Sequence, residues 1–258
     1  MAVEVVEELS GLDDVSFARD LAARTGELLL RVREEVGYAD FWTLQDEGDR
    51  AAQVFIDRQL RAHRPDDAIL SEEAPDDWVS RESADRVWII DPVDGTSAFA
   101  RRGSTEWAVH VALWEAGELV LGVVARPATG EIFDSQTVQL APVQHPGRVR
   151  VAASRSRASD IVRAVCHDVH AEVVTMSSAG VKALAVVTGE VDAYLHTGGQ
   201  SQWDNAAPVA VALGAGLVAT RFDGSPIVYN GPEVEIDDLI ICRPERIDEF
   251  RSAIDSRL

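Results

Sequence analysis

The chain has 258 residues and a formal charge of −20, from 44 acidic and 24 basic residues. It is 46% hydrophobic and 26% charged, which is typical of a globular protein with a full hydrophobic core. The excess of acids argues against sequence-independent binding to DNA or RNA, because such binding neutralises phosphates with Lys and Arg. No apolar run reaches the roughly 18 residues of a membrane span. The acidic N-terminus lacks the basic region of a signal peptide, so we expect a cytoplasmic protein with no membrane partner.

Two cysteines, Cys166 and Cys242, are too few for a disulfide framework or a four-thiolate zinc site. We expect both to be buried as small hydrophobic residues. His167 and His170 lie near Cys166, but no fourth ligand follows at a suitable spacing. A zinc site is therefore not expected there.

The first half of the chain predicts two amphipathic helices and then several strands. Apolar residues recur at helical spacing from Ser16 to Val36, and again from near Asp49 to just before Pro65. The pattern then changes to alternating or continuous apolar runs, which are typical of strands. The predicted strands are 68–70, 87–90, 107–114, 119–125 and 130–134, the last of which closes a meander.

After Pro142 and Pro146 the sequence alternates between strands and helices. We therefore predict an α+β half, residues 1–145, and an α/β half, residues 146–258, with a boundary near 141–147. The glycines of Leu213–Gly216 end a helix, so we interpret them as a helix C-cap rather than a dinucleotide loop. The predicted strands are 148–153, 173–176, 193–195, 217–220 and 239–242, and the predicted helices are 159–169, 178–187, 203–213 and 247–257.

Two carboxylates, Asp91 and Asp94, follow the buried strand 87–90 in the stretch WIIDPVDGT. Asp-Pro and Asp-Gly are turn formers, so both acids can be explained by a turn alone. Alternatively, hard cations such as Mg²⁺ prefer oxygen ligands, and a tight turn presents both carboxylates with the Val93 carbonyl between them. Gly95 allows the backbone to approach an anion closely.

Three further acids occur at comparable positions. Glu72 follows a strand, although the loop after it is acidic and suits a solvated surface. Asp49 and Asp204 lie where helices are predicted to begin, and the simpler interpretation of each is an N-cap. Pro208 fits the first turn of the second of these helices. Because capping does not exclude ligation, acids at four comparable junctions are better explained jointly than separately.

These motifs together resemble the ordered signature of the inositol monophosphatase superfamily. The pair WIIDPVDGT and WDNAAP is highly specific, and the resemblance spans nearly the whole chain. Within the superfamily the chain is most similar to the CysQ group of 3′(2′),5′-bisphosphate nucleotidases, in particular its actinobacterial members. The resemblance implies the layered αβαβα sandwich of the sugar phosphatases, Mg²⁺-dependent and lithium-sensitive phosphomonoesterase activity, and a homodimer. The segments that carry this likeness are LSEEAPDD, DRVWIIDP, WAVHVALWE, DAYLHTGGQ, WDNAAP and DGSPIVYN.

The resemblance also implies a set of metal ligands. One ion would be held by Glu72, Asp91 and the Val93 carbonyl, and a second by Asp91, Asp94 and Asp204. A third, weaker ion would share Glu72. The expected cofactor is therefore Mg²⁺, with two or three ions in each active site.

For catalysis, the resemblance implies that Asp49 and Thr96, together with Glu72, activate a metal-bound water without a covalent intermediate. The substrate would be 3′-phosphoadenosine 5′-phosphate, or its sulfated form PAPS, as in sulfate assimilation. Ser178 and Lys182, which is the only lysine, would clamp the second phosphate with His196. The implied substrate contacts are Glu72, Val93, Asp94, Gly95, Thr96, Ser178, Lys182, His196 and Asp204.

Two departures and two alternatives accompany this interpretation. Ser97-Ala98-Phe99 matches neither the inositol phosphatases nor many CysQ proteins. Phe41–Leu44 stands where inositol phosphatases carry a lysine in a flexible loop, which weakens the case for a third metal held by that loop. The alternatives are an inositol-1-monophosphatase or fructose-1,6-bisphosphatase, and a non-catalytic regulator that binds Mg²⁺ or a phosphorylated metabolite. The pair Asp49 and Thr96 favours an enzyme, because a binder does not need to activate water.

Overall fold

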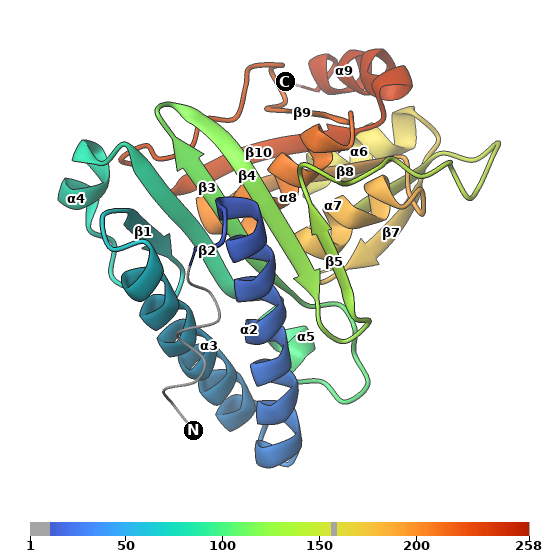
Figure 1. The fold of residues 1–258 in the computed structure, drawn as a ribbon. Helices are drawn as coiled ribbons and strands as arrows, with labels where there is room; N and C mark the ends of the chain where they lie inside the picture. The colour runs from blue at the N-terminus through green and yellow to red at the C-terminus, as the bar shows by residue number, and fades with distance from the viewer. Residues whose placement is uncertain (1–10, 156–158, 258) are drawn as a thin grey trace.

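The computed structural model describes residues 11–155 and 159–257, and Figure 1 shows that they form alternating layers of helices and sheets. The strands of the first sheet are β1 (Ala68–Ser71), β2 (Arg86–Asp94), β3 (Ala108–Glu115), β4 (Glu118–Arg126) and β5 (Glu131–Asp134). Those of the second are β6 (Arg150–Ser154), β7 (Glu172–Met176), β8 (Ala193–Ser201), β9 (Val218–Thr220) and β10 (Glu235–Cys242). The helices are α2 (Asp14–Val36), α3 (Phe41–His63), α4 (Trp78–Ser83), α5 (Thr96–Phe99), α6 (Asp160–Asp168), α7 (Ala179–Val187), α8 (Gln202–Gly214), η1 (Pro244–Arg246) and α9 (Ile247–Asp255).

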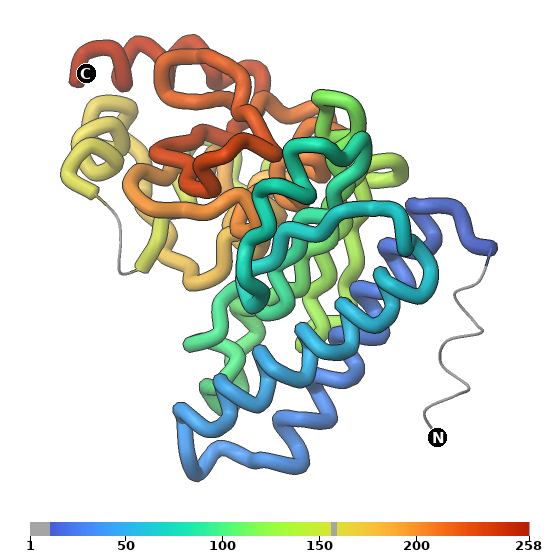
Figure 2. The backbone as a smooth tube through the Cα atoms, turned by 90° about the vertical axis from the view of Figure 1, so that its left-hand side faces the viewer, coloured from blue at the N-terminus to red at the C-terminus, as the bar shows by residue number. Residues whose placement is uncertain are grey.

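The layers follow the order α, β, α, β, α, which confirms the predicted sandwich. Helices α2 and α3 pack on one face of the first sheet, and α7 and α8 lie between the two sheets. Helices α6 and α9 cover the outer face of the second sheet. In the side view of Figure 2 the green strands of the first sheet lie between the blue helices and the orange and red second half.

Both sheets are mixed. In the first sheet the order is β1-β2-β3-β4-β5, with β1 parallel to β2 and the remaining neighbours antiparallel, so the predicted meander is confirmed. In the second the order is β7-β6-β8-β10-β9, with β6 parallel to both neighbours and β10 antiparallel to both of its own.

Helix α3 begins at Phe41 and not near Asp49. The Asp40 side chain caps it by accepting from the amides of Trp42 and Thr43, at 3.0 and 3.2 Å. Asp49 therefore lies inside the helix, and its interpretation as an N-cap is wrong. Residues 41–44 form the first helical turn and not part of a loop.

Strand β2 continues to Asp94, four residues beyond its predicted end at Ile90. Its pairing with β3 is irregular between Asp91 and Asp94, so these acids lie in a distorted strand end and not in a turn. The turn follows at Gly95, whose φ of +86° suits glycine.

Helix α8 begins at Gln202, after the N-cap Ser201. Asp204 occupies the third helical position of a capping box, where it accepts from the Ser201 amide at 2.6 Å. The interpretation of Asp204 as the N-cap residue is therefore wrong by three positions. Pro208 lies in the helix interior and not in the first turn.

The largest apolar cluster joins the two halves of the chain. It contains Leu70 and Ile89 from the first sheet, Leu184 and Val211 from the central helices, and Ile241 from the second sheet. The boundary near 141–147 falls in the segment between β5 and β6 and stays a prediction. None of the helices in residues 11–155 and 159–257 is both long and apolar enough to cross a membrane.

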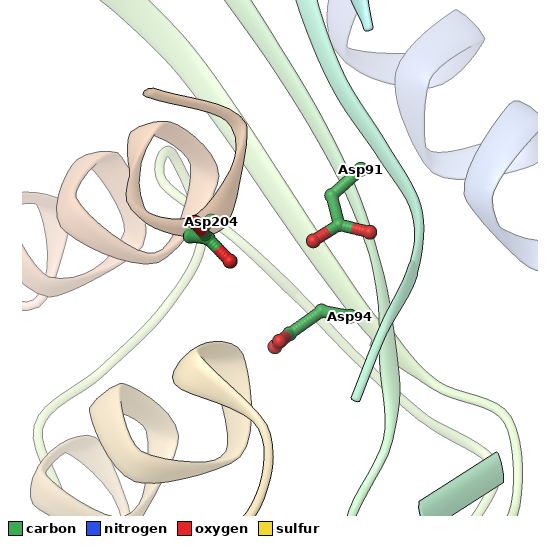
Figure 3. A group of neighbouring side chains, drawn as sticks. All are labelled: Asp91, Asp94 and Asp204. Carbon is green, nitrogen blue, oxygen red and sulfur yellow. The ribbon is translucent and has the colours of Figure 1, made fainter. Parts of the chain in front are cut away.

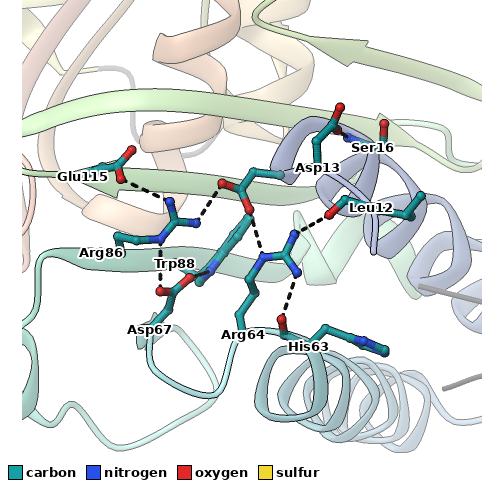
Figure 4. Close-up of polar contacts among 10 residues, drawn as sticks. Leu12, Asp13, Ser16, His63, Arg64, Asp67, Arg86, Trp88 and Glu115 are labelled. Carbon is teal, nitrogen blue, oxygen red and sulfur yellow. Dashed lines mark hydrogen bonds and ion pairs between the residues drawn. The ribbon is translucent and has the colours of Figure 1, made fainter. Parts of the chain in front are cut away.

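Charged side chains anchor β2 at the end remote from Asp94. Arg86, its first residue, pairs with Asp14 at 2.8 Å, Asp67 at 3.0 Å and Glu115 at 3.2 Å (Figure 4). Arg64 adds a 2.8 Å ion pair to Asp14 and a hydrogen bond to the Leu12 carbonyl. These contacts attach the start of α2 to the start of β2.

Both cysteines are free and buried, as expected.

Candidate active site

Three chain segments deliver acids to one edge of the first sheet. The parallel register of β1 and β2 pairs Ser71 with Ile90, and the Glu72 amide donates to the Ile90 carbonyl at 3.3 Å. Glu72 therefore follows β1 just where Asp91 follows Ile90 in β2. The third segment is the first turn of α8, which approaches this edge from the second half of the chain and carries Asp204.

Asp91, Asp94 and Asp204 point toward a common space (Figure 3). Each offers one carboxylate oxygen, and these oxygens lie within 4.8 Å of one another. Asp91 and Asp94 are buried and Asp204 is half-buried. The buried Asp91 Oδ2 has no hydrogen-bond partner in the described parts of the chain. A cation fits such a group of oxygens, because buried carboxylates need a compensating positive charge.

The pKa values of Asp91 and Asp94 are shifted in opposite directions. Burial, followed by the charges of Glu72, Asp94 and Asp204, raises the pKa of Asp91 well above its ordinary value. Burial also opposes ionisation of Asp94, but His110, Lys182 and the Ser178 hydroxyl together lower its pKa to about 2. Asp94 is therefore a carboxylate at any physiological pH.

Glu72 lines the same cleft but does not belong to the compact group of three. The loss of hydration in the cleft and the charge of Asp204 raise the pKa of Glu72 to about 7. The structure thus brings three of the four predicted acidic ligands into one cluster and places the fourth beside it. Val93 is buried, and its carbonyl accepts from the Thr96 hydroxyl at 3.1 Å.

Asp49 lies on α3 beside this cluster. It is half-buried and lines a separate hollow with Asp46, Arg50 and Glu73, so it is not among the residues that line the cleft with Asp91, Asp94 and Asp204. Burial, followed by the charges of Glu73 and Glu72, raises the pKa of Asp49 to about 7. No hydrogen bond joins Asp49 to Thr96 in the part of the chain that the structure describes, so their action as a pair stays a prediction.

The inositol monophosphatase family model matches residues 13–253. The chain belongs to this family. Several mycobacterial relatives are named 3′-phosphoadenosine 5′-phosphate phosphatase. That of Mycobacterium leprae is 46% identical over 91% of this chain and 90% of its own length, and that of M. tuberculosis is 47% identical over 85% of each. The Salmonella typhimurium 3′(2′),5′-bisphosphate nucleotidase CysQ is 30% identical over 83% of this chain and 92% of its own.

Solved structures agree on the fold of this inositol monophosphatase family member. CysQ from Bacteroides thetaiotaomicron matches with a TM-score of 0.77 at 24% identity, over 88% of this chain and 95% of that one. Inositol monophosphatase II from Staphylococcus aureus matches with a TM-score of 0.76 at 18% identity, over 93% and 97% of the two chains.

The acidic cluster lines a cleft of about 410 Å³. The same lining includes Lys182 and His196, both predicted, and Arg155, which was missed. Arg155 directly follows β6, as Glu72 follows β1, and this position at a strand end was the signal that could have identified it. The residues that line the cleft are Glu72, Asp91, Val93, Asp94, Gly95, Thr96, Ser97, Arg101, Ser154, Arg155, Ser177, Ala179, Lys182, His196, Gln200 and Asp204.

The predicted phosphate clamp is only partly at the cleft surface. Lys182 is 2% exposed, its Nζ donates to the Ser177 carbonyl at 3.1 Å, and it lies 5.2 Å from the centre of the Tyr194 ring. Ser178 is fully buried, caps α7, and donates its hydroxyl to Asp94. Ser177, and not Ser178, lines the cleft.

Proposed function

We propose that the chain is a Mg²⁺-dependent phosphomonoesterase that removes the 3′-phosphate of 3′-phosphoadenosine 5′-phosphate, and of PAPS. The observation that carries this proposal is the convergence of Asp91, Asp94 and Asp204 on one space, in a cleft that is also lined by Lys182 and Arg155. The names of the mycobacterial relatives support the choice of substrate. From the family likeness we also propose a cytoplasmic homodimer.

We propose two or three Mg²⁺ ions in the site. Glu72, Asp91 and the Val93 carbonyl would hold one, and Asp91, Asp94 and Asp204 a second. When bound, such ions lower the pKa of a coordinated water and stabilise charge on phosphoryl oxygens. The donor set supports this assignment, because it consists of oxygens only and includes a buried carboxylate oxygen without a hydrogen-bond partner among the described residues.

The side chains of this protein would position the reactants and move one proton. Asp49, with a pKa of about 7, is suited to accept a proton from water near neutral pH. Thr96 fixes the Val93 carbonyl through its 3.1 Å hydrogen bond. Because phosphoryl transfer requires little covalent chemistry from the protein, this positioning supplies most of the catalytic effect.

The basic side chains of the cleft would select a substrate with two phosphates. With a formal charge of −20 the protein as a whole repels anions, so local cations must offset this at the cleft. Lys182 and His196 line the cleft with Arg155, whose guanidinium also forms an ion pair with Glu106 at 3.0 Å. We infer that these side chains hold the 5′-phosphate while the 3′-phosphate lies at the acidic cluster.

A substrate panel with and without Mg²⁺ tests the proposal. We expect 3′-phosphoadenosine 5′-phosphate to be hydrolysed with a higher kcat/KM than inositol 1-phosphate or fructose 1,6-bisphosphate. A preference for either of these would overturn the substrate assignment. We further expect Asp94→Asn to abolish phosphate release, whereas Asp237→Asn, which changes an exposed acid paired with Arg221, retains it. A wild-type protein that binds the nucleotide and Mg²⁺ without releasing phosphate would be a regulator.

A further inference from the structure

His110 is the third residue of β3 and is completely buried. In the sheet it pairs with Asp91, but its ring reaches toward Asp94 and α8. Its Nε2 lies 3.1 Å from Asp94 Oδ2, and its Nδ1 lies 3.2 Å from the Trp203 carbonyl oxygen. The ring therefore contacts one proposed metal ligand and the residue that precedes another, Asp204.

The His110 ring fits against α7 only because the facing residue, Gly180, has no side chain. Gly180, in the first turn of α7, faces it so closely that a Cβ atom there would lie 2.2 Å from His110 Nε2. Glycine is thus the residue that lets the imidazole and the start of α7 approach Asp94 together.

Asp94 is enclosed from the other side by α7. The Ala179 amide donates to Oδ1 at 3.1 Å, and the Gly180 amide donates to Oδ2 at 2.7 Å. The Ser178 hydroxyl also donates to Oδ2. With His110 against Oδ2, the carboxylate is fixed between a strand of the first half and a helix of the second.

We propose that His110 is a positioning residue, which holds Asp94 and the first turn of α8 at the separation at which Asp94 and Asp204 share a cation. Trp203 and Asp204 are consecutive, so the Nδ1 contact acts on the backbone that carries the Asp204 side chain. This inference rests on the proposed metal-dependent function. It assigns no contact between His110 and substrate.

A purely structural role predicts a different result. If His110 only fills space in the core, an apolar side chain of similar size should preserve metal binding once the protein is folded. If it positions ligands, loss of its polar contacts should weaken the metal site, as is observed for residues that orient metal ligands. Glutamine and asparagine retain a polar group and should retain part of the affinity.

The test uses the full chain and Mn²⁺ as the probe, with the dissociation constant measured by calorimetry and folding checked by thermal melting. We expect His110→Leu to weaken Mn²⁺ binding by about 10- to 100-fold, and His110→Gln or His110→Asn by less. Val109→Ala is the matched control, because Val109 is buried in the same strand but packs in the cluster beneath α2 and α3. It should lower the melting temperature and leave Mn²⁺ affinity unchanged.

Unchanged affinity in a folded His110→Leu, or an equal loss in Val109→Ala, would overturn the inference. So would a wild-type protein that does not bind Mn²⁺. Should His110→Leu fail to fold, the His110→Gln and His110→Asn variants decide in its place, since wild-type affinity in both would also overturn it. The proposed function fails separately, if the wild type binds Mn²⁺ but does not hydrolyse 3′-phosphoadenosine 5′-phosphate.

Discussion

Lys182 is the residue whose substitution should separate substrates most sharply. The residue is nearly buried and lines the cleft, so its interaction with a phosphate would be weakly screened by solvent. We predict that Lys182→Met lowers kcat/KM for 3′-phosphoadenosine 5′-phosphate by roughly 10- to 100-fold, the value of a charge-assisted hydrogen bond. Adenosine 3′-monophosphate, which lacks the 5′-phosphate, should lose much less.

The control for Lys182→Met is Arg61→Met, because Arg61 is an exposed cation whose side chain is 73% accessible and pairs with Asp57 on α3. The kinetic constants of the Arg61→Met variant should remain those of the wild type. Equal losses for the bisphosphate and the monophosphate in Lys182→Met would show that the lysine does not recognise the second phosphate.

Single residues differ in how well the sequence predicts them. The carboxylates could be predicted from the sequence because they follow strands, and the ends of neighbouring strands meet at one edge of a sheet. The role of His110 could not be predicted, because it depends on contacts with Asp94 across the strand pair and with Trp203, 93 positions away in the sequence. In the sequence alone, a histidine between apolar residues is indistinguishable from a core residue.

At the scale of elements, α4 is attached to the second half of the chain by a buried arginine. Arg81, with a fully buried side chain, binds Asp76 through two bonds of 2.6 and 2.8 Å and the Asn230 amide oxygen at 2.6 Å. The backbone N–H of Asn230 in turn donates to the side-chain oxygen of Gln202, the first residue of α8, at 2.7 Å. This network links the loop after Glu72 to the helix that carries Asp204.

We predict that Arg81→Met lowers the free energy of unfolding by about 3 kcal/mol, because it leaves buried polar partners unsatisfied. Chemical denaturation gives this value. Arg61→Met serves again as the comparison, since an exposed ion pair within a helix contributes less than about 0.5 kcal/mol. Similar values for the two variants would mean that the Arg81 network does not stabilise the fold.

Helix α8 packs unusually close to β4 at Gly122. A Cβ atom at this position would lie 2.5 Å from the Ala207 carbonyl oxygen and 2.6 Å from the Ala210 Cβ. We predict that Gly122→Ala lowers the free energy of unfolding by about 1 to 3 kcal/mol, because the helix must move away from the sheet. Urea denaturation measures the loss. Gly231→Ala, where the Glu233 carbonyl oxygen lies 3.8 Å from the added Cβ, should have almost no effect, and an equal loss there would contradict this account.

Periodicity predicted most elements but not all of their limits. The first two turns of α3 were missed because they precede the regular apolar spacing that begins at Ala52, and the start of the helix depends on the Asp40 cap. The end of β2 was misplaced because Pro92 suggests a turn, whereas the strand tolerates it in an irregular pairing with β3. Helices α4 and α5 are too short to show a period.

For the whole molecule, the fold class followed from the order of strands and helices, but the layers did not. The order β7-β6-β8-β10-β9 depends on which strand faces fit together, and no local pattern encodes it. The layered arrangement was predicted through the family resemblance. A large apolar cluster joins residues on both sides of the predicted boundary near 141–147, so the packing is continuous across it.

The carboxyl groups of the site should make the stability of the whole protein depend on both pH and metal. Asp49 and Glu72 have pKa values of about 7, above their ordinary values of 3.8 and 4.5. A raised pKa means that the folded state binds more protons than the unfolded state, so the stabilisation is complete below about pH 4 and is lost as pH rises through 7. In EDTA we therefore predict a melting temperature that falls between about pH 5 and about pH 8, by the equivalent of about 2 kcal/mol after allowance for solvent screening.

Mg²⁺ should reduce or reverse this decrease, because a bound cation favours the ionised carboxylates and stabilises the folded state in proportion to its binding. Asp49→Asn should flatten the profile in EDTA, since it removes one of the groups whose proton is lost. Calorimetric melting of the wild type and Asp49→Asn, each with EDTA and with Mg²⁺, separates the two contributions. A wild-type melting temperature that rises with pH in EDTA would show that the acids are compensated without a cation, and the metal site would then lose its electrostatic basis.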